Sequence, residues 1–327
     1  MSNSILTKKI LYWYDNNKRV LPWRKSFSQI KREYYTLVSE FMLQQTQVIT
    51  VVPYFNNFIK NIPNISSLAK INEQKLLKYW EGLGYYSRVR NLKKTAQILK
   101  KNFKGRLPRT IDELKLLPGI GEYTANAIMA IGFNKPFIPL DGNIERVIKR
   151  LLNLKLINEI SKKNLISKKK IFGTSTRASD YAQALMELGA LICRPKTPLC
   201  KQCPLTKNCK SFKNNDFEII KERKKKIDKF YLLNVYKKNN KFLLVKNTKF
   251  GFLKNLKIFP MSEIYKHNNL EKALNFKISN MNMNVVIKFS KIKSLILNSY
   301  WIDSSKLDSY TLPTFTKKIF SYLEKNK

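Results

Sequence analysis

The sequence predicts a mainly α protein with a smaller α+β domain at its C-terminal end. Apolar residues recur at helical spacing from Ile5 to about Lys210, strand-like runs begin near Phe230, and a charged segment lies between them. The 327 residues, 43% of them hydrophobic, suffice for about two domains with buried cores. We expect a first domain at 1–212, a linker at 213–229 and a second domain at 230–327.

Apolar stripes with helical periodicity run through the first region, for example at Leu37, Val38 and Phe41. Proline and glycine interrupt these stripes and divide them into short helices joined by tight turns. The breaks are expected at Pro53, 82–84, Pro108, 117–121 and 136–142. The first domain is therefore expected to be all α.

The linker and the second domain follow from a change of pattern. Residues 221–229 contain six basic and two acidic side chains without apolar periodicity, which favours a solvated linker. Strand-like runs at 230–236 and 241–246 flank an Asn239-Asn240 turn, and further strand signals continue to about Leu312. A closing helix is expected from about Thr314.

The chain carries a formal charge of +41, from 63 basic and 22 acidic residues, which favours binding to nucleic acid. Nucleotide bias toward lysine codons is an alternative origin of this charge. All twelve arginines lie at or before Arg223, however, and such a bias does not explain that distribution. We infer a first domain that contacts phosphates, and we expect the protein to be a monomer.

The N-terminal segment lacks the apolar run of a signal peptide or a membrane span. Lys8 and Lys9 precede only four apolar residues, 10–13, before polar residues follow. We expect a cytoplasmic protein that associates with the nucleoid and not with a membrane.

The four cysteines lie within seventeen residues and have the spacing C-x6-C-x2-C-x5-C; they are Cys193, Cys200, Cys203 and Cys209. Their confinement to one loop favours a metal site over structural disulfides. Zinc sites usually pair two close CxxC units, and only one is present here, so the spacing favours an iron-sulfur cluster and leaves zinc open.

A turn with two glycines, Gly119 and Gly121, opens a small-residue helix and is suited to presenting backbone amides to a phosphate. A plain connection between helices is the alternative. Two carboxylates flank this turn in sequence. Asp141 follows it and could simply cap a helix, whereas Glu40 precedes it and by pattern is an ordinary exposed helix residue.

These motifs together resemble the endonuclease III and MutY superfamily of DNA glycosylases. The cysteine spacing resembles its cluster loop, and the hairpin followed by Asp141 resembles its helix-hairpin-helix members. Residues 39–48, which contain Glu40, are similar to the motif of MutY-type adenine DNA glycosylases. The resemblance implies one 4Fe-4S cluster in the loop 193–209 and a Nudix-like second domain without catalytic Nudix glutamates.

The resemblance also implies catalytic roles. Glu40 would protonate the adenine and later help to activate water, and Asp141 would stabilise the oxocarbenium-like sugar, supported by Tyr123 and Asn143. Tyr123 occupies the position of the Schiff-base lysine in bifunctional relatives, which implies a monofunctional enzyme.

DNA contacts are implied at several further positions, with Tyr85 wedging into the duplex and Gln45 meeting the partner base. These positions are Arg24, Gln44, Gln45, Tyr85, Arg88, Gly119, Gly121, Phe289 and Ser290. Lys291 stands where the family has a histidine after Ser290, and His267 is the only histidine in the chain. This departure weakens the inference of strong 8-oxoguanine recognition.

The expected function is removal of adenine paired with 8-oxoguanine or guanine in double-stranded DNA, which leaves an abasic site. One alternative is a pyrimidine glycosylase with lyase activity, against which Glu40 and Tyr123 argue. The other is a DNA-binding protein without catalysis, against which the pair of Glu40 and Asp141 argues.

Overall fold

The computed structural model describes residues 5–25, 27–155, 161–218, 227–265, 273–278, 280–292 and 296–326. Residues 219–226 of the expected linker and the single histidine, His267, lie outside the described residues. The chain divides into two compact units. The first unit is Met1–Ile71 with Ser87–Lys221, and the second is Asn72–Tyr86 with Glu222–Lys327.

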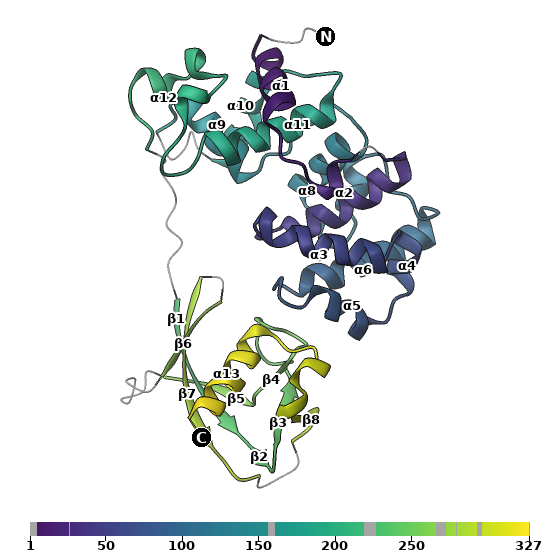
Figure 1. Ribbon diagram of the computed structural model, residues 1–327, viewed down its shortest axis with the longest axis vertical. Helices are drawn as coiled ribbons and strands as arrows, with labels where there is room; N and C mark the ends of the chain where they lie inside the picture. The colour runs from purple at the N-terminus through teal and green to yellow at the C-terminus, as the bar shows by residue number, and fades with distance from the viewer. Residues whose placement is uncertain are drawn as a thin grey trace. The chain divides into compact units, whose positions relative to one another are not determined.

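The first unit is helical in its described part, and the predicted all-α character is confirmed (Figure 1). Its longer helices are α1 (Ile5–Asn17), α2 (Gln29–Leu43), α3 (Val48–Asn61), α6 (Ser87–Asn102), α9 (Gly142–Leu152) and α11 (Ala178–Glu187). Shorter ones are α4 (Ile65–Lys70), α7 (Ile111–Lys115), α8 (Glu122–Ala127), α10 (Lys162–Lys168) and α12 (Lys210–Lys213).

Short 3-10 and π turns join these helices. The 3-10 turns are Pro22–Arg24, Lys169–Phe172, Cys200–Gln202 and Thr206–Asn208, and the π turns are Ile128–Gly132 and Leu188–Ile192. The two π turns extend α8 and α11 respectively. π turns are frequent at functional sites, so the ends of α8 and α11 are candidate positions for functional residues.

One hydrophobic core joins α1 to the helices that precede the cysteine loop. α1 lies alongside α11 (Figure 1), and Ile10, Ile148 and Leu185 in this core are fully buried. Cys193, Cys203 and Cys209 pack against the same core. The cysteine loop is therefore anchored to the helical unit by burial of apolar surface.

The expected helix break at Pro53 is wrong, because Pro53 lies inside α3. Proline removes one backbone donor, which would have bonded to the carbonyl of Ile49 one turn earlier. Pro53 is exposed and Ile49 is 80% exposed, so water can hydrate that carbonyl. The helix continues because the lost hydrogen bond lies on its solvated face.

The second unit combines two sheets with a C-terminal helix, which confirms the predicted α+β character. Its strands are β1 (Ile227–Val235), β2 (Lys237–Lys238), β3 (Lys241–Lys246), β4 (Lys257–Ile258), β5 (Met261–Ile264), β6 (Leu274–Ile278), β7 (Met281–Phe289) and β8 (Ser299–Asp303). One sheet has the order β5-β1-β7-β6, with β1 and β7 parallel, and in the other β3 pairs with β2, β4 and β8. A 3-10 turn, Ser304–Ser309, follows β8, and α13 (Thr314–Lys325) contributes Ile319 and Phe320 to the core.

The second unit also includes α5 (Glu73–Trp80) and the turn after it, which the sequence had assigned to the first domain. Glu81 accepts a hydrogen bond from the backbone nitrogen of Leu312 at 3.3 Å and pairs with Lys317 at 2.8 Å. Lys78 donates to the carbonyl of Asp308 at 2.7 Å. These polar contacts link α5 to the segment that leads into α13.

Membrane insertion through a helix has no support in the described part of the chain. None of its helices combines the length and the apolar character that crossing a bilayer requires.

Candidate active site

Glu40 is held in the interior by the last turns of α2. Its neighbours Leu37, Val38 and Phe41 are fully buried, and Glu40 itself is only 5% exposed. The buried surface of α2 therefore extends beyond its apolar stripe. The expectation that Glu40 is an ordinary exposed helix residue is wrong. Among the described residues, Oε2 of Glu40 has no hydrogen-bond partner, and an unpaired buried carboxylate oxygen is costly.

The environment of Glu40 favours its protonated form. Burial, together with the nearby charge of Asp141, raises the pKa of Glu40 from 4.5 to about 7. A hydrogen bond with Tyr123 and the charge of Arg24 act in the opposite direction. A carboxyl group with this pKa can hold a proton near neutral pH and transfer it to a bound molecule.

Tyr123 lies in the first turn of α8 and forms a hydrogen bond with Glu40. Burial, and then the charges of Glu40 and Asp141, raise the pKa of Tyr123 well above its ordinary value. The phenol therefore remains protonated and is available as a donor to the carboxyl group.

Asp141 is the N-cap of α9, as expected for an aspartate that caps a helix. Its Oδ1 accepts from the backbone nitrogens of Asn143 at 3.1 Å and Ile144 at 2.7 Å, and its Oδ2 accepts from Nδ2 of Asn143 at 2.8 Å. Burial raises the pKa of Asp141, and these three hydrogen bonds oppose that shift. The cap also orients the carboxylate beside Glu40, so the capping and catalytic roles are compatible.

Arg146 connects this carboxylate site to the cysteine loop. Its Nη2 donates to Oδ1 of Asn143 at 2.8 Å and to the carbonyl of Gly189 at 2.6 Å, and its Nε donates to the carbonyl of Cys193 at 2.6 Å. Asn143 in turn donates to Asp141. Arg146 is not among the site residues predicted from the sequence, because an arginine one turn into a helix resembles any exposed basic residue.

Gly189 lies in the π turn at the end of α11 and packs directly against Asn143. A Cβ atom at Gly189 would lie 2.6 Å from Cβ of Asn143 and 2.8 Å from its carbonyl oxygen. Only glycine permits this close approach, and no local sequence signal identified it.

The cysteine loop gathers its four thiols in one partly buried region. Arg150 is buried and donates to the carbonyls of Arg194 at 2.6 Å and Pro195 at 2.7 Å, with its Nη1 3.5 Å from Sγ of Cys193. The backbone nitrogen of Leu205 donates to Sγ of Cys203 at 3.4 Å. Donors directed at sulfur suit a set of thiolates bound to a metal group.

No group of three or more His, Cys, Asp or Glu side chains within the described ranges is arranged to hold a metal ion. A cluster of several irons separates its thiolates more widely than a single zinc ion does. Burial, together with the neighbouring cysteines, raises the pKa of Cys203 to about 11. Such thiols need a cationic group to lose their protons, so the loop suits a metal group, and the cluster stays a prediction.

The hairpin turn between α7 and α8 packs closely on α2. Gly119 has a φ of +82°, and a Cβ there would lie 2.8 Å from the ring of Phe41. Nε2 of Gln44 donates to the carbonyl of Gly119 at 3.3 Å. Gln45, next along the chain, also has a positive φ, of 58°. The hairpin and the residues that follow Glu40 are therefore held together.

Two arginines expected to contact DNA have other partners in the structure. Arg88 is 6% exposed, and its Nη1 donates to the carbonyls of Phe41 at 3.2 Å and Met42 at 2.8 Å. Arg24 pairs with buried Glu187 at 2.8 Å and its side chain is 13% exposed. Nη1 of Arg88 thus binds carbonyl groups at the end of α2, and Arg24 contributes charge near Glu40. DNA contact through either arginine stays a prediction.

The remaining expected DNA contacts belong to the second unit. Tyr85 is 45% exposed and has a φ of 46°, directly after Gly84 with a φ of 71°. Phe289 at the end of β7 is 65% exposed. Ser290 Oγ contacts Oδ1 of Asn234 at 3.2 Å, and the neighbouring Lys291 is exposed.

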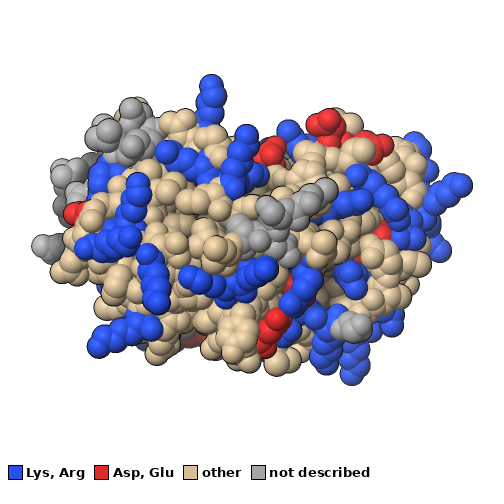
Figure 2. Space-filling model, turned by 90° about the horizontal axis from the view of Figure 1, so that it is seen from above, with Lys and Arg blue, Asp and Glu red and all other residues tan. Residues whose placement is uncertain are grey.

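The surface is strongly basic. Lysine and arginine side chains are spread over the face shown in Figure 2 and outnumber the acidic ones there. Such a surface favours a polyanionic partner.

Comparisons with known proteins identify the family of this chain. Residues 38–170 match the HhH-GPD superfamily of base excision DNA repair proteins. The chain is 37% identical to the adenine DNA glycosylase of Buchnera aphidicola subsp. Baizongia pistaciae, over 99% of this chain and 98% of that protein. Among solved structures, a thermostable thymine-DNA glycosylase matches with a TM-score of 0.57 and 26% identity, over 63% of this chain and 94% of the other. An endonuclease III–DNA complex, at 21% identity and a TM-score of 0.52, shows the same fold over 66% of this chain and 98% of the other.

The fold and these matches define a helix-hairpin-helix protein of base excision DNA repair. Within that class, the near full-length similarity shows that the chain belongs to the adenine DNA glycosylase family.

Proposed function

We propose that this protein removes adenine paired with 8-oxoguanine or guanine in double-stranded DNA by hydrolysis, leaving an abasic site. The observation that carries the proposal is the buried carboxyl group of Glu40, whose pKa is about 7, beside Tyr123 and Asp141. Adenine leaves more easily as a neutral molecule, and this requires a proton donor. A DNA-binding protein without catalysis would gain nothing from a buried acid.

The first step is transfer of the Glu40 proton to the five-membered ring of the adenine. The hydrogen bond with Tyr123 orients the carboxyl group, and burial excludes water that would compete for the proton. The bond between the base and the sugar then breaks with its electron pair on the departing base.

Asp141 acts on the sugar side of the same bond. The sugar becomes positively charged as the base leaves, and a fixed carboxylate stabilises that charge. Its hydrogen bonds to the backbone of α9 and to Asn143 hold the carboxylate in place before the reaction. Glu40, now deprotonated, accepts a proton from the attacking water.

The enzyme is proposed to be monofunctional. Strand cleavage through a Schiff base needs an amine that attacks the sugar, and at the hairpin helix position of that lysine the chain has Tyr123. A phenol that remains protonated cannot replace it.

The four cysteines are proposed to hold one 4Fe-4S cluster. The group, when bound, would ligate the four thiolates, offset part of their negative charge and fix the loop, and it would take no part in the hydrolysis. Arg150 and the backbone of Leu205 would support the sulfur atoms of Cys193 and Cys203.

The second unit is proposed to read the base opposite the adenine through Phe289 and Ser290. The exposed ring of Phe289 suits contact with a base, and the hydroxyl of Ser290 can donate or accept a hydrogen bond. Lys291 replaces the histidine of the family and adds charge for the phosphates. Tyr85 and Gln45 are proposed to enter the duplex as the adenine turns out.

A single-turnover assay with matched duplexes tests this proposal. Purified protein is mixed with duplexes that carry adenine opposite 8-oxoguanine, guanine or thymine, and with one duplex that carries thymine glycol. Samples are analysed with and without alkali. We expect adenine release from the first two duplexes and strand cleavage only after alkali. Excision of thymine glycol with direct cleavage would support the lyase alternative, and tight binding without release would support the non-catalytic one.

A further inference from the structure

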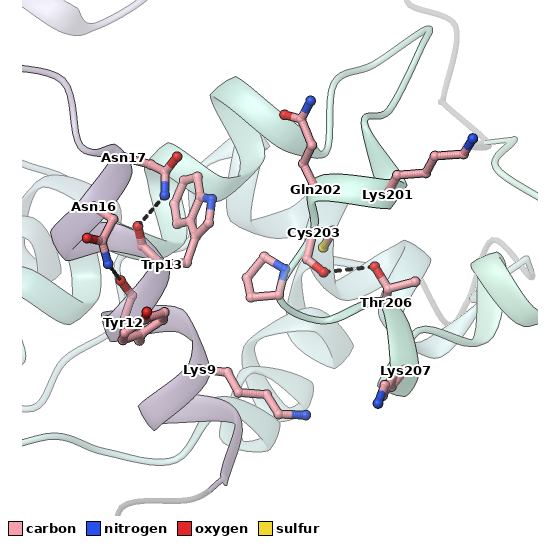
Figure 3. Close-up of a pocket in the computed structure, with 11 residues that line it drawn as sticks. Lys9, Tyr12, Trp13, Asn16, Asn17, Lys201, Gln202, Cys203, Thr206 and Lys207 are labelled. Carbon is pink, nitrogen blue, oxygen red and sulfur yellow. Dashed lines mark hydrogen bonds between the residues drawn. The ribbon is translucent and has the colours of Figure 1, made fainter.

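A pocket of about 700 Å³ lies between α1 and the cysteine loop (Figure 3). One wall is a stripe of α1 at helical spacing, formed by Lys9, Tyr12, Trp13, Asn16 and Asn17. The other wall is formed by the loop residues from Lys201 to Lys207. The pocket shares no lining residue with the site of Glu40, Tyr123 and Asp141, and its size is that of a small-molecule site.

The lining is cationic and contains no acidic side chain. Lys9, Lys201 and Lys207 contribute three positive charges, and within the described part of the chain none of them pairs with a carboxylate. Asp15, the only acid on α1, is held by Arg177 at 2.6 and 2.9 Å. The charge of the pocket is therefore available to an anionic group such as a phosphate.

Aromatic rings accompany this charge. Tyr12 is 77% exposed, which is unusual for so large a ring, whereas Trp13 is 7% exposed and closes the wall of α1. Lys9 extends from α1 toward the loop on the same side (Figure 3). An exposed ring beside lysines can stack on a nucleobase whose phosphate they bind.

Carboxamides provide the third recognition element. Nδ2 of Asn16 donates to the carbonyl of Tyr12, and Nδ2 of Asn17 to that of Trp13, both at 2.8 Å. These bonds orient both side chains and leave their oxygens as acceptors, which suit the amino groups of a base. On the opposite wall, Oγ1 of Thr206 contacts the carbonyls of Cys200 at 2.6 Å and Cys203 at 2.8 Å. These contacts within the cysteine loop stabilise that wall.

We propose that this pocket binds one nucleoside phosphate unit, with the base on Tyr12 and the phosphate on Lys9 and Lys207, whose side chains extend toward each other (Figure 3). The unit is either a free nucleotide or one nucleotide of an unpaired strand, because a stacked duplex exposes no base face to Tyr12. An acidic peptide would satisfy the lysines but would leave the ring and the carboxamides unused.

Photolabelling tests the proposal on the full chain with its metal group in place. One arm uses 8-azido-ATP, and the other uses an eight-nucleotide single strand that contains 5-iodouracil. Excess unlabelled duplex is present in both arms to occupy the duplex-binding surface. Mass spectrometry is expected to locate the label on the α1 peptide that contains Tyr12, and the arm that labels more strongly identifies the source.

Variants and competitors make the test specific. Tyr12→Ala, and separately Lys9→Gln with Lys207→Gln, are expected to lower labelling of α1 roughly tenfold. The control pair Lys196→Gln and Lys210→Gln removes the same charge from the same region outside the lining and should leave labelling unchanged. Unlabelled dAMP should compete at far lower concentration than inorganic phosphate.

Three results would overturn the proposal. The first is an unlabelled α1 peptide in both arms, and the second is an equal loss in the control pair, which would indicate general charge attraction. The third is competition by an oligoglutamate peptide but not by dAMP, which would assign the pocket to an acidic protein segment.

Discussion

At the residue scale, the protonation state of Glu40 should govern the pH dependence of base release. The folded pKa of Glu40 is about 7, above its ordinary value of 4.5. We expect the single-turnover rate to fall as pH rises through about 7, approaching tenfold per pH unit well above it. A rate that does not change between pH 6 and 9 would remove the acid role from Glu40.

The raised pKa of Glu40 also makes the stability of the folded protein depend on pH. Because the folded state binds this proton more tightly than the unfolded state, the contribution of Glu40 is greatest below pH 4.5 and declines between pH 4.5 and 7. Glu40→Gln should therefore abolish excision while raising unfolding stability at pH 8 by on the order of 2 kcal/mol. Denaturant unfolding of both proteins at pH 5 and pH 8 measures the difference, which should be several-fold smaller at pH 5.

The two roles of Asp141 can be separated by paired substitutions. Asparagine can cap α9 but carries no charge, so Asp141→Asn should keep the melting temperature and lower excision at least about a hundredfold. Asp141→Ala should also cost about 1 kcal/mol of stability through the lost cap. Single-turnover rates and thermal melts on both variants check this, and near-normal excision by Asp141→Asn would leave only the capping role.

At the element scale, the π turn that ends α11 determines how closely it approaches the start of α9. Gly189→Ala places a Cβ 2.6 Å from Asn143, so the two helices must separate. We expect a loss of about 1–3 kcal/mol in stability and slower excision, because Asn143 donates to Asp141. Gly251→Ala, whose Cβ meets nothing within 4 Å, is the control and should change neither quantity.

The cysteine loop is the second element whose removal can be tested. Cys200→Ser should reduce retention of the proposed cluster, which visible absorption measures, and weaken duplex binding, which a filter assay measures. Arg146 and Arg150 join this loop to α9, so excision should fall as well. An unchanged absorption spectrum would argue against ligation by Cys200.

At the scale of the whole molecule, the charge of +41 should dominate duplex affinity. Counterion release predicts that the logarithm of the binding constant falls linearly with the logarithm of salt concentration. We expect at least a hundredfold loss between about 50 and 200 mM salt, measured by fluorescence anisotropy on undamaged duplex. A shallow slope would mean that most of the lysines do not contact phosphates.

Local patterns in the sequence predicted much of the fold of this protein. Helical stripes, the turn at Gly119, the spacing of the four cysteines and the strand runs after the linker depend on residues close in the chain. Periodicity reports which face of one helix is apolar, so these features are visible without coordinates. They were sufficient for the fold class and for the position of Asp141.

The pKa of Glu40 and the hydrogen-bond partners of the arginines could be determined only from the tertiary structure. Glu40 lies off the apolar stripe of α2, and its pKa depends on burial and on Tyr123 and Asp141, more than eighty residues away in sequence. Arg88 and Arg146 resemble surface residues until their carbonyl partners are known. Burial and hydrogen bonding between distant segments set both the pKa values and these partners, and no local pattern encodes them.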